Sequence, residues 1–314
     1  MNSLLIDTES GKQVAKILFE KFNSEGIFGP NVMPEDLLWG SDLSDIGTKR
    51  GSYGHLMFIT MVVSIDYQRD ADKLWEAGRK TMDDAETKWL FSPDIVNGKP
   101  VSEIMLAMRK HRLSQKHSKD AGIWKKVAES FSNVYESDPR NLLKECGYDA
   151  MKIYSKKYDI RFKKNFPFLS GNKIFPLWLR MLHDNLDIDL KNLEKIPIPV
   201  DVHIARTTFT TGCLKGDYTG TIADISPKID EAWKKVVMEL EHPKIKYALQ
   251  LDESLWHLGK YGCTKRKGSF CPKKEQCPVS EFCVDSDIHV SAKGIKVDSG
   301  GTHGKASLNR FVLR

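Results

Sequence analysis

Four cysteines near the end of the 314-residue chain have the spacing of metal ligands. Cys263, Cys271, Cys277 and Cys283 form a C-x7-C-x5-C-x5-C pattern. Thiolates bind soft metals, but tetrahedral zinc prefers close C-x2-4-C pairs, and this stretch contains none. A cubane iron–sulfur cluster suits more widely spaced cysteines, because its irons lie several ångströms apart. The pattern predicts a [4Fe–4S] cluster, with zinc as the first alternative and reactive or structural thiols as the second.

The start of the sequence, MNSLLIDTESGKQ, has neither a basic region nor a long apolar one, so we expect no secretion. A cysteine group in such a chain indicates metal binding rather than disulfides, and the isolated Cys146 and Cys213 are expected to be buried thiols. No apolar run approaches the roughly 18 residues of a membrane span, so we expect no membrane partner. The expected location is the cytoplasm, associated with the nucleoid, in a prokaryote, with the nucleus open in a eukaryote.

Basic residues gather in three stretches of the chain, residues 109–119, 152–164 and 260–274. The net charge is only +6, which fits a polyanionic partner without requiring one. Each stretch alone is more often a solvated face than a binding site. Three such stretches around one cleft would instead bind a phosphate backbone.

The elements that must position these residues are mainly helices. From Gly54 to Gly78 an apolar run and then a polar one predict a buried helix, a turn near residues 66–69, and a second helix carrying Leu74 and Trp75. Helical spacing predicts further helices over 101–114, 122–135 and 229–240, and one that begins at Pro139 behind Asp138 as N-cap. Alternating strands are scarce, and residues 285–314 are expected to be extended. The fold class is therefore mainly α.

Three segments together resemble the helix-hairpin-helix DNA glycosylases that carry an iron–sulfur loop, of which endonuclease III is the type member. LMFITMVVSIDYQRDADKLWE resembles the family's early helix pair, whose connecting loop reaches DNA. FPFLSGNKIFPLWLRML and IPIPVDVHIAR resemble its hairpin, catalytic lysine and catalytic aspartate region, and PVDVH is similar to the aspartate motif of the 8-oxoguanine DNA glycosylase branch. LWHLGKYGC resembles the helix that leads into the cluster loop. The first segment is Leu56–Glu76, the second combines Phe166–Leu182 with Ile196–Arg206, and the third is Leu255–Cys263.

The chain departs from the family pattern in three places. One is the separation of Lys173 and Asp201, which is 28 positions and longer than in endonuclease III, with His183–Lys195 as the insertion that could accommodate it. The family hairpin usually reads L-P-G-x-G-x-K, whereas Pro167–Lys173 has Leu169 at the first glycine position and keeps only Gly171. The family cluster spacing is usually C-x6-C-x2-C-x5-C, and the middle gap is longer here.

The resemblance implies two catalytic residues, Lys173 and Asp201. Excision of a base passes through an oxocarbenium-like state at C1′, which a carboxylate such as Asp201 would stabilise. Asp201 also precedes a helix start and could be its N-cap; the two roles are compatible. A Lys173 amine that attacks C1′ would form a Schiff base and permit strand cleavage. The alternative for Lys173 is a phosphate contact or a solvated side chain.

The resemblance also implies a set of DNA-binding residues. The turn at residues 66–68 would enter the duplex and fill the vacated stack, or be an ordinary surface turn. The basic residues between the first two cysteines would contact phosphates. His203 could contact phosphate or pack internally, and Phe175 and Trp178 are expected to be core residues. The predicted DNA-binding residues are Asp66, Tyr67, Gln68, Gly171, His203, Lys265, Arg266 and Lys267.

We therefore expect a two-lobed protein. One lobe is a helical bundle with the hairpin, over 51–185. The other combines 1–50 with 186–284 and carries the cysteine loop, and 285–314 form a tail. Lys173 and Asp201 would face each other across a groove. The expected function is a monomeric DNA glycosylase that flips and excises a modified base from double-stranded DNA, with Schiff-base lyase activity. The alternatives are a monofunctional glycosylase that uses only Asp201 and a non-catalytic iron–sulfur DNA-binding protein.

Overall fold

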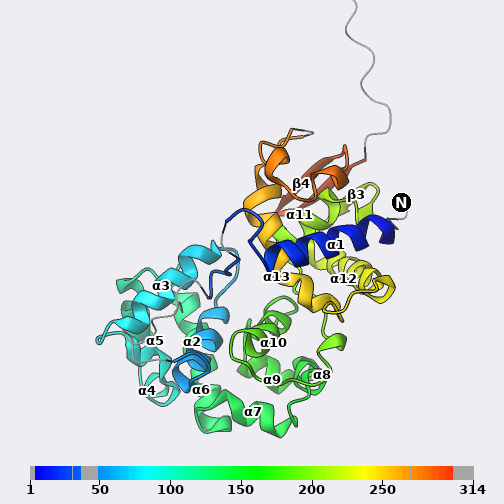
Figure 1. The fold of residues 1–314 in the computed structure, drawn as a ribbon. Coiled ribbons are helices and arrows are strands. Elements are labelled where there is room, and N and C mark those ends of the chain that lie inside the picture. Colours follow the sequence, from blue (N-terminus) through cyan, green and yellow to red (C-terminus); the bar gives the residue numbers. More distant parts are fainter. Residues whose placement is uncertain (1–3, 30, 37–48, 269, 300–314) are drawn as a thin grey trace, which may run out of the picture. The chain divides into compact units, whose positions relative to one another are not determined.

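Helices dominate the computed structural model, as the sequence predicted, and it describes residues 4–29, 31–36, 49–268 and 270–299. The chain divides into two compact units (Figure 1). Unit 1 combines Met1–Asn31 with Val200–Arg314, and unit 2 is the continuous stretch Val32–Pro199. No helix within the described ranges is both long enough and apolar enough to cross a membrane.

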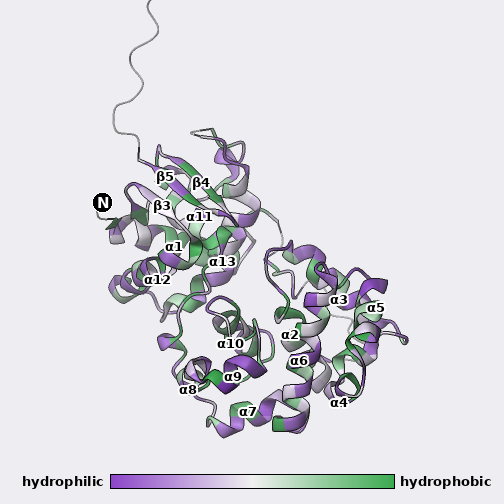
Figure 2. Ribbon diagram, turned by 180° about the vertical axis from the view of Figure 1, so that it is seen from behind, coloured by the Kyte–Doolittle hydropathy of each residue, from purple (hydrophilic) through white to green (hydrophobic). Residues whose placement is uncertain are grey.

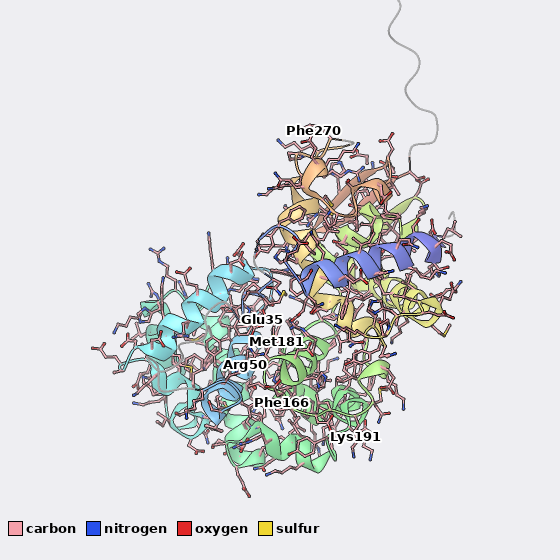
Figure 3. All side chains as sticks on the ribbon, viewed as in Figure 1. Glu35, Arg50, Phe166, Met181, Lys191 and Phe270 are labelled. Carbon is pink, nitrogen blue, oxygen red and sulfur yellow. The ribbon has the colours of Figure 1, made fainter. Side chains whose placement is uncertain are left out.

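The boundaries of the units differ from the predicted boundaries at 51 and 185. Unit 2 begins earlier than predicted, at Val32, and Glu35 forms a buried ion pair with Arg180, with 2.6 Å between Oε1 and Nη2. Figure 3 labels Glu35 and Met181, the residue that follows Arg180 in the sequence. Unit 2 also ends later than predicted, at Pro199. The Ala150 amide donates to the Lys191 carbonyl and the Lys191 amide to the Tyr148 carbonyl, each at 2.8 Å. Neither contact is visible as a local sequence pattern.

Unit 2 is built around α2, whose residues are almost all buried, and α10, which packs against it. Trp178 of α10 donates its indole N–H to the Thr60 hydroxyl of α2 at 3.0 Å, so a large ring is buried without losing its hydrogen bond. Figure 2 shows α9 as mostly hydrophilic. The helices of unit 2 are α2 (Tyr53–Val63), α3 (Ala71–Asp83), α4 (Pro93–Asn97), α5 (Val101–Lys110), α6 (His117–Tyr135), α7 (Pro139–Glu145), α8 (Ala150–Ser155), α9 (Ile160–Asn165) and α10 (Ile174–Asp184), with 3-10 turns at Lys88–Phe91, Lys156–Tyr158 and Leu193–Lys195.

Several sequence predictions for unit 2 are confirmed. The run from Gly54 to Gly78 forms α2, a turn and α3, and Asp138 caps α7 by accepting a hydrogen bond from the Arg140 amide at 2.9 Å. The predicted helix over 101–114 ends earlier, at Lys110, and the one over 122–135 begins earlier, at His117. Cys146 is buried, as expected.

Unit 1 joins the two ends of the chain. Helix α1 lies beside α12 (Figure 1), and strand β1 pairs antiparallel with β2. The predicted helix over 229–240 begins earlier, at Ile222, behind a capping box of Thr221 and Asp224. Cys213 is buried, as expected. The helices and strands of unit 1 are β1 (Leu5–Ile6), α1 (Thr8–Phe22), α11 (Val202–Thr210), β2 (Leu214–Lys215), β3 (Tyr218–Gly220), α12 (Ile222–Glu239), α13 (Asp252–His257), β4 (Asp287–Ser291) and β5 (Gly294–Asp298), with a π-helical turn at Leu258–Gly262 and 3-10 turns at Ala248–Leu251, Cys263–Lys265, Lys274–Gln276 and Ser280–Phe282.

The stretch predicted as an extended tail, 285–314, contains a small antiparallel sheet. β4 and β5 form a hairpin, and β5 also pairs with β3, which gives the strand order β3-β5-β4. Val290, Ile295 and Val297 are the buried side chains of this sheet. The rest of the predicted tail, 300–314, lies outside the described residues.

Candidate functional site

The hairpin of unit 2 connects α9 to α10 through residues 166–173. The Ser170 amide donates to the Phe166 carbonyl at 3.0 Å and the Gly171 amide to the Phe168 carbonyl at 2.8 Å. The left-handed residue of the turn is Phe168, with φ of 63°, so Leu169 needs no glycine-like backbone. Gly171 remains necessary for another reason, because a Cβ there would lie 2.8 Å from the Phe168 carbonyl oxygen. The structure therefore keeps a tight turn although the first family glycine is missing.

Lys173 lies at the end of this turn and is the N-cap residue of α10. Its Nζ lies 3.1 Å from Oδ2 of Asp66, which follows α2. The Asp66 side chain is 9% exposed and that of Lys173 is 32% exposed. A buried carboxylate thus holds an amine that still reaches the surface.

The three predicted DNA-binding residues in the turn after α2 differ in burial and in their contacts. Asp66 is buried in the ion pair with Lys173. Tyr67 stacks on Phe168 with 4.5 Å between ring centroids and 26° between planes, and its hydroxyl donates to Asp120 Oδ1 at 2.5 Å. Gln68 is exposed, has a φ of 51°, and accepts a hydrogen bond from Lys116 Nζ at 2.8 Å. Gln68 is therefore the accessible tip of the turn.

Tyr67 is fixed more firmly than a surface tyrosine. Burial, followed by the hydrogen bond to Asp120, raises the pKa of its hydroxyl above the usual range. The ammonium groups of Lys116 and Lys119 lie 4.7 Å and 4.9 Å from its ring centroid. Asp120 is itself buried and accepts the amides of Gln115 and Lys116. The sequence did not indicate Phe168 or Asp120 as site residues, because their contacts join segments far apart in the chain.

In unit 1, Asp201 is the N-cap of α11. Its Oδ1 accepts hydrogen bonds from the amides of His203 at 2.7 Å and Ile204 at 3.0 Å. This is the capping role that the sequence predicted, and it places a negative charge at the positive end of the helix dipole. Asp201 and Lys173 belong to different units, and the expectation that they face each other stays a prediction.

His203 is half-buried in unit 1, and its ring lies in a T-shaped arrangement with Trp256, with 5.4 Å between ring centroids. The π-helical turn before Cys263 presses closely on the same part of α11. A Cβ at Gly259 would lie 2.4 Å from the His203 carbonyl oxygen, so only glycine fits there. The position of Asp201 is thus tied to the segment that leads into the cysteines.

Arg206 is a further connection that the sequence did not single out. Its Nη1 donates to the Thr264 hydroxyl at 2.9 Å, next to Cys263, and its Nη2 donates to the Val290 carbonyl of β4 at 2.7 Å. Burial lowers the pKa of this guanidinium, and the thiol of Cys263 and the carboxylate of Asp201 act in the opposite direction. The position of Arg206, five residues after Asp201, was the available signal.

The four cysteines line one cavity of about 300 Å³ in unit 1. Burial raises the pKa of Cys263 and Cys283, and that of Cys277 to about 11, and the thiols of Cys283, Cys277 and Cys271 add to the effect on Cys263. Among the described residues, no group of three or more histidine, cysteine and acidic side chains is arranged to hold a metal ion. The sulfurs therefore surround a common space without converging on a single ion position.

Arg266 lines the same cavity. Its Nε donates to the Gly268 carbonyl at 2.6 Å, and its Nη2 donates to the carbonyls of Val284 at 2.6 Å and Ser286 at 3.0 Å. Its Nη1 is buried and has no hydrogen-bond partner within the described part of the chain. Lys265 and Lys267 are exposed on either side, as is Phe270, which Figure 3 labels. Much of Arg266 thus holds the cysteine segment together, while the two lysines remain accessible.

Comparison with known proteins places the Lys173, Asp201 and cysteine segments within the match to a single family model. Residues 172–283, which include Lys173, Asp201 and the four cysteines, match the model of the AGOG family, described as N-glycosylase/DNA lyase. The fold is similar to that in two endonuclease III structures, a trapped covalent intermediate with DNA (an estranged-adenine complex) and a non-covalent DNA complex. Each match has a TM-score of 0.51 and 13% sequence identity, and it covers 90% of this chain and 97% of the endonuclease III chain. No curated protein sequence matches the chain. The predicted mainly helical fold is confirmed, and it is similar to the fold of endonuclease III.

Proposed function

We propose that this helix-hairpin-helix DNA glycosylase excises a modified base from double-stranded DNA and then cleaves the strand through a Schiff base on Lys173. The observation that carries the proposal is the Lys173 amine, which stands at the end of the hairpin turn, partly exposed and held by a buried carboxylate. It lies within the range that matches an N-glycosylase/DNA lyase family. The two endonuclease III structures of similar fold both contain DNA, one of them as a trapped covalent intermediate.

Asp201 is the proposed electrostatic partner of the excision step. A base can be released only after the nucleotide leaves the stack, because the duplex shields C1′. As the C1′–N bond breaks, positive charge develops on the sugar, and the Asp201 carboxylate would stabilise it. Only Oδ1 of Asp201 is used in capping α11 among the described contacts, so capping leaves Oδ2 for this role.

A monofunctional glycosylase remains the second candidate, and the Asp66–Lys173 contact favours it. An ammonium in an ion pair has no lone pair with which to attack C1′. If its proton stays on nitrogen, water attacks instead, and Asp201 alone serves the chemistry.

Borohydride reduction on DNA that carries an abasic site tests the lysine directly. A Schiff base on Lys173 gives a covalent protein–DNA adduct, and Lys173→Gln gives none. No adduct with the wild-type protein, together with release of a modified base, would establish the monofunctional alternative. Duplexes with oxidised, deaminated, alkylated and hypermodified bases, analysed for released base, identify the substrate. No release from any of them would indicate a non-catalytic DNA-binding protein.

We also propose that Cys263, Cys271, Cys277 and Cys283 hold a [4Fe–4S] cluster. Two features of the site fit such a group: four thiols around a common cavity, and the buried Nη1 of Arg266, a donor that could face sulfur. The C-x7-C-x5-C-x5-C spacing, which contains no close C-x2-4-C pair, makes zinc the poorer fit. When bound, the cluster would cross-link the cysteine segment and fold it, with no redox step in base excision.

Metal analysis tests this assignment. Protein purified without oxygen should be brown and contain about four irons per chain. Cys271→Ser should lose colour and solubility together, because the ligands also fold the segment. A colourless protein with one zinc per chain would refute the cluster.

A further inference from the structure

We propose that Asp66 is the positioning residue that accepts the proton of the Lys173 ammonium and so converts it into a nucleophile. The inference rests on the proposed Schiff-base function of Lys173. It assigns a chemical role to a residue that the sequence analysis placed only in a DNA-contacting turn.

The ion pair joins two segments that are 107 residues apart, with Nζ of Lys173 3.1 Å from Oδ2 of Asp66. The carboxylate is buried, whereas about a third of the lysine side chain is exposed. The Lys173 amine is therefore accessible to a DNA sugar from solvent while it contacts the buried Asp66 carboxylate. A proton acceptor must lie within hydrogen-bond reach of the proton, and Asp66 does.

The surrounding contacts fix this geometry. The Asp66 amide donates to the Val63 carbonyl at 3.0 Å, which anchors the turn to the end of α2. The next residue, Tyr67, stacks on Phe168 of the hairpin and donates to Asp120. Turn and hairpin are thus clamped side by side, one carrying the carboxylate and the other the amine.

Two further charged side chains near the Asp66–Lys173 pair are Arg69, in the turn after α2, and Asp120, which accepts the Tyr67 hydroxyl. The guanidinium of Arg69 is close enough to Asp66 and Asp120 for both carboxylates to raise its pKa, against the larger lowering by burial. Arg69 Nη1 donates to the Leu113 carbonyl at 2.9 Å, which holds it in place. Asp66 thus faces two cations, Lys173 and Arg69.

The chemical step balances without any external reagent. The ammonium passes one proton to Oδ2 of Asp66, and the neutral amine adds through its lone pair to C1′ of the aldehyde form of the abasic sugar. Proton transfer from nitrogen to oxygen gives a carbinolamine. Asp66 then returns its proton to the departing hydroxyl, which leaves as water, and the protonated imine forms. The carboxylate ends as it began, so the net change is ammonium plus aldehyde to iminium plus water.

Single-turnover borohydride trapping on DNA with a preformed abasic site isolates this step from base excision. Asp66→Asn should trap at least roughly 10²-fold more slowly than wild type, the usual range for loss of a proton-transfer group. Its rate should rise about tenfold per pH unit, because the proton must now go to hydroxide, whereas the wild-type rate should vary less. Asp70→Asn, an acid-to-amide change at the nearby N-cap of α3, should trap like wild type.

Chemical rescue covers the case in which asparagine disturbs the fold. Asp66→Ala leaves space for a small acid, so formate should restore part of its trapping rate and should not affect the wild-type protein. Asp66→Glu should keep more activity than Asp66→Asn, because it retains a carboxylate.

Two outcomes separate the inference from the function on which it rests. If wild-type protein gives no adduct at all, the Schiff-base function of Lys173 fails, and the inference fails with it. If wild type traps but Asp66→Asn traps at the same rate with the same pH profile, or if formate rescues nothing, Asp66 is not the acceptor, while the role of Lys173 stands.

Discussion

Asp201 has a structural role as the N-cap of α11 and a proposed chemical role in base excision. Its Oδ1 satisfies two of the four amides that the start of α11 leaves without a helical partner. A negative charge there is stabilised by the helix dipole, so it costs little to keep near a reacting centre. The capping role and the proposed catalytic role differ in what they require: capping needs an oxygen, whereas stabilisation of an oxocarbenium-like state needs a charge.

Replacing Asp201 with Asn separates these two requirements. The amide oxygen should still cap α11, so the melting temperature should change little. Base excision should fall by roughly 10²–10⁴, about 3–5 kcal/mol of barrier, because the charge is lost. Single-turnover base release measures the excision, and binding to modified DNA should persist.

Asp138 provides the matched control, because it caps α7 in the same way. Asp138→Asn should leave both excision and DNA binding unchanged. Excision by Asp201→Asn at the wild-type rate would leave Asp201 with a structural role only.

At the scale of elements, the stretch between the first two cysteines divides its charges. Lys265 and Lys267 are exposed, whereas Arg266 is used to hold the carbonyls of Val284 and Ser286. Replacing both lysines with Ala should flatten the slope of log K against log salt by about two units, since each phosphate contact releases about one counterion. DNA-binding titrations over a range of salt concentrations measure it.

Arg266→Ala should behave differently from the lysine pair. It should loosen the cysteine segment and lower the melting temperature, with little change in the salt slope. An unchanged slope in the double lysine variant would show that this stretch does not contact DNA.

The close approach of the π-helical turn to α11 gives a second element-scale prediction. In Gly259→Ala the new methyl group would meet the His203 carbonyl oxygen at 2.4 Å, so backbone must move. We expect a loss of about 1–3 kcal/mol of stability and slower excision, because the start of α11 carries Asp201.

Gly122→Ala in α6 is the control, because nothing lies within 4 Å of its added Cβ. Helix propensity should make that variant more stable by up to about 1 kcal/mol. Thermal or urea unfolding compares the two, and equal stability in both variants would show that the contact with His203 yields easily.

Sequence patterns predicted those elements that depend on near neighbours along the chain. The apolar run of α2, the Asp138 cap and the Asp201 cap are all local signals, and all are present. The short helices α8 and α9 were not predicted, because neither is long enough to show a period. The β3-β5-β4 sheet joins Tyr218–Gly220 to a hairpin far along the chain. The contacts of Asp66 with Lys173 and of Tyr67 with Phe168 also join residues that are far apart in the sequence. Only the folded chain reveals such pairings.

At the scale of the whole molecule, a buried histidine should make stability depend on pH. His55 in α2 is fully buried, and its Nδ1 accepts the Gly51 amide at 3.1 Å, which requires a neutral ring. Burial, with a smaller effect of Arg50, lowers its pKa from 6.5 to about 4. The unfolded chain therefore binds the proton more readily than the folded chain. The contribution of His55 to the free energy of unfolding is fully present above pH 6.5 and is lost as the pH falls towards about 4.

The full effect is on the order of 3 kcal/mol, of which about 2 kcal/mol should be lost between about pH 7 and pH 5. Urea unfolding at the two pH values measures the loss, and His55→Gln should remove most of it. An equal loss in the variant would assign the effect to other groups.

The composition of unit 1 from both chain ends has a consequence for how the protein is made. Strand β1 and helix α1 emerge from the ribosome before unit 2, yet their partners β2 and α12 lie about two hundred residues later. The ion pair of Asp7 with Lys215 spans 208 positions. At about 5–20 residues per second, translation from the end of unit 2 to β5 takes roughly 5–20 s. Unit 2 is continuous and can fold during that interval, while the first helix waits with its apolar face uncovered. The four cysteines are translated after unit 2, so a nascent chain stalled before them would carry a complete unit 2 and an incomplete unit 1.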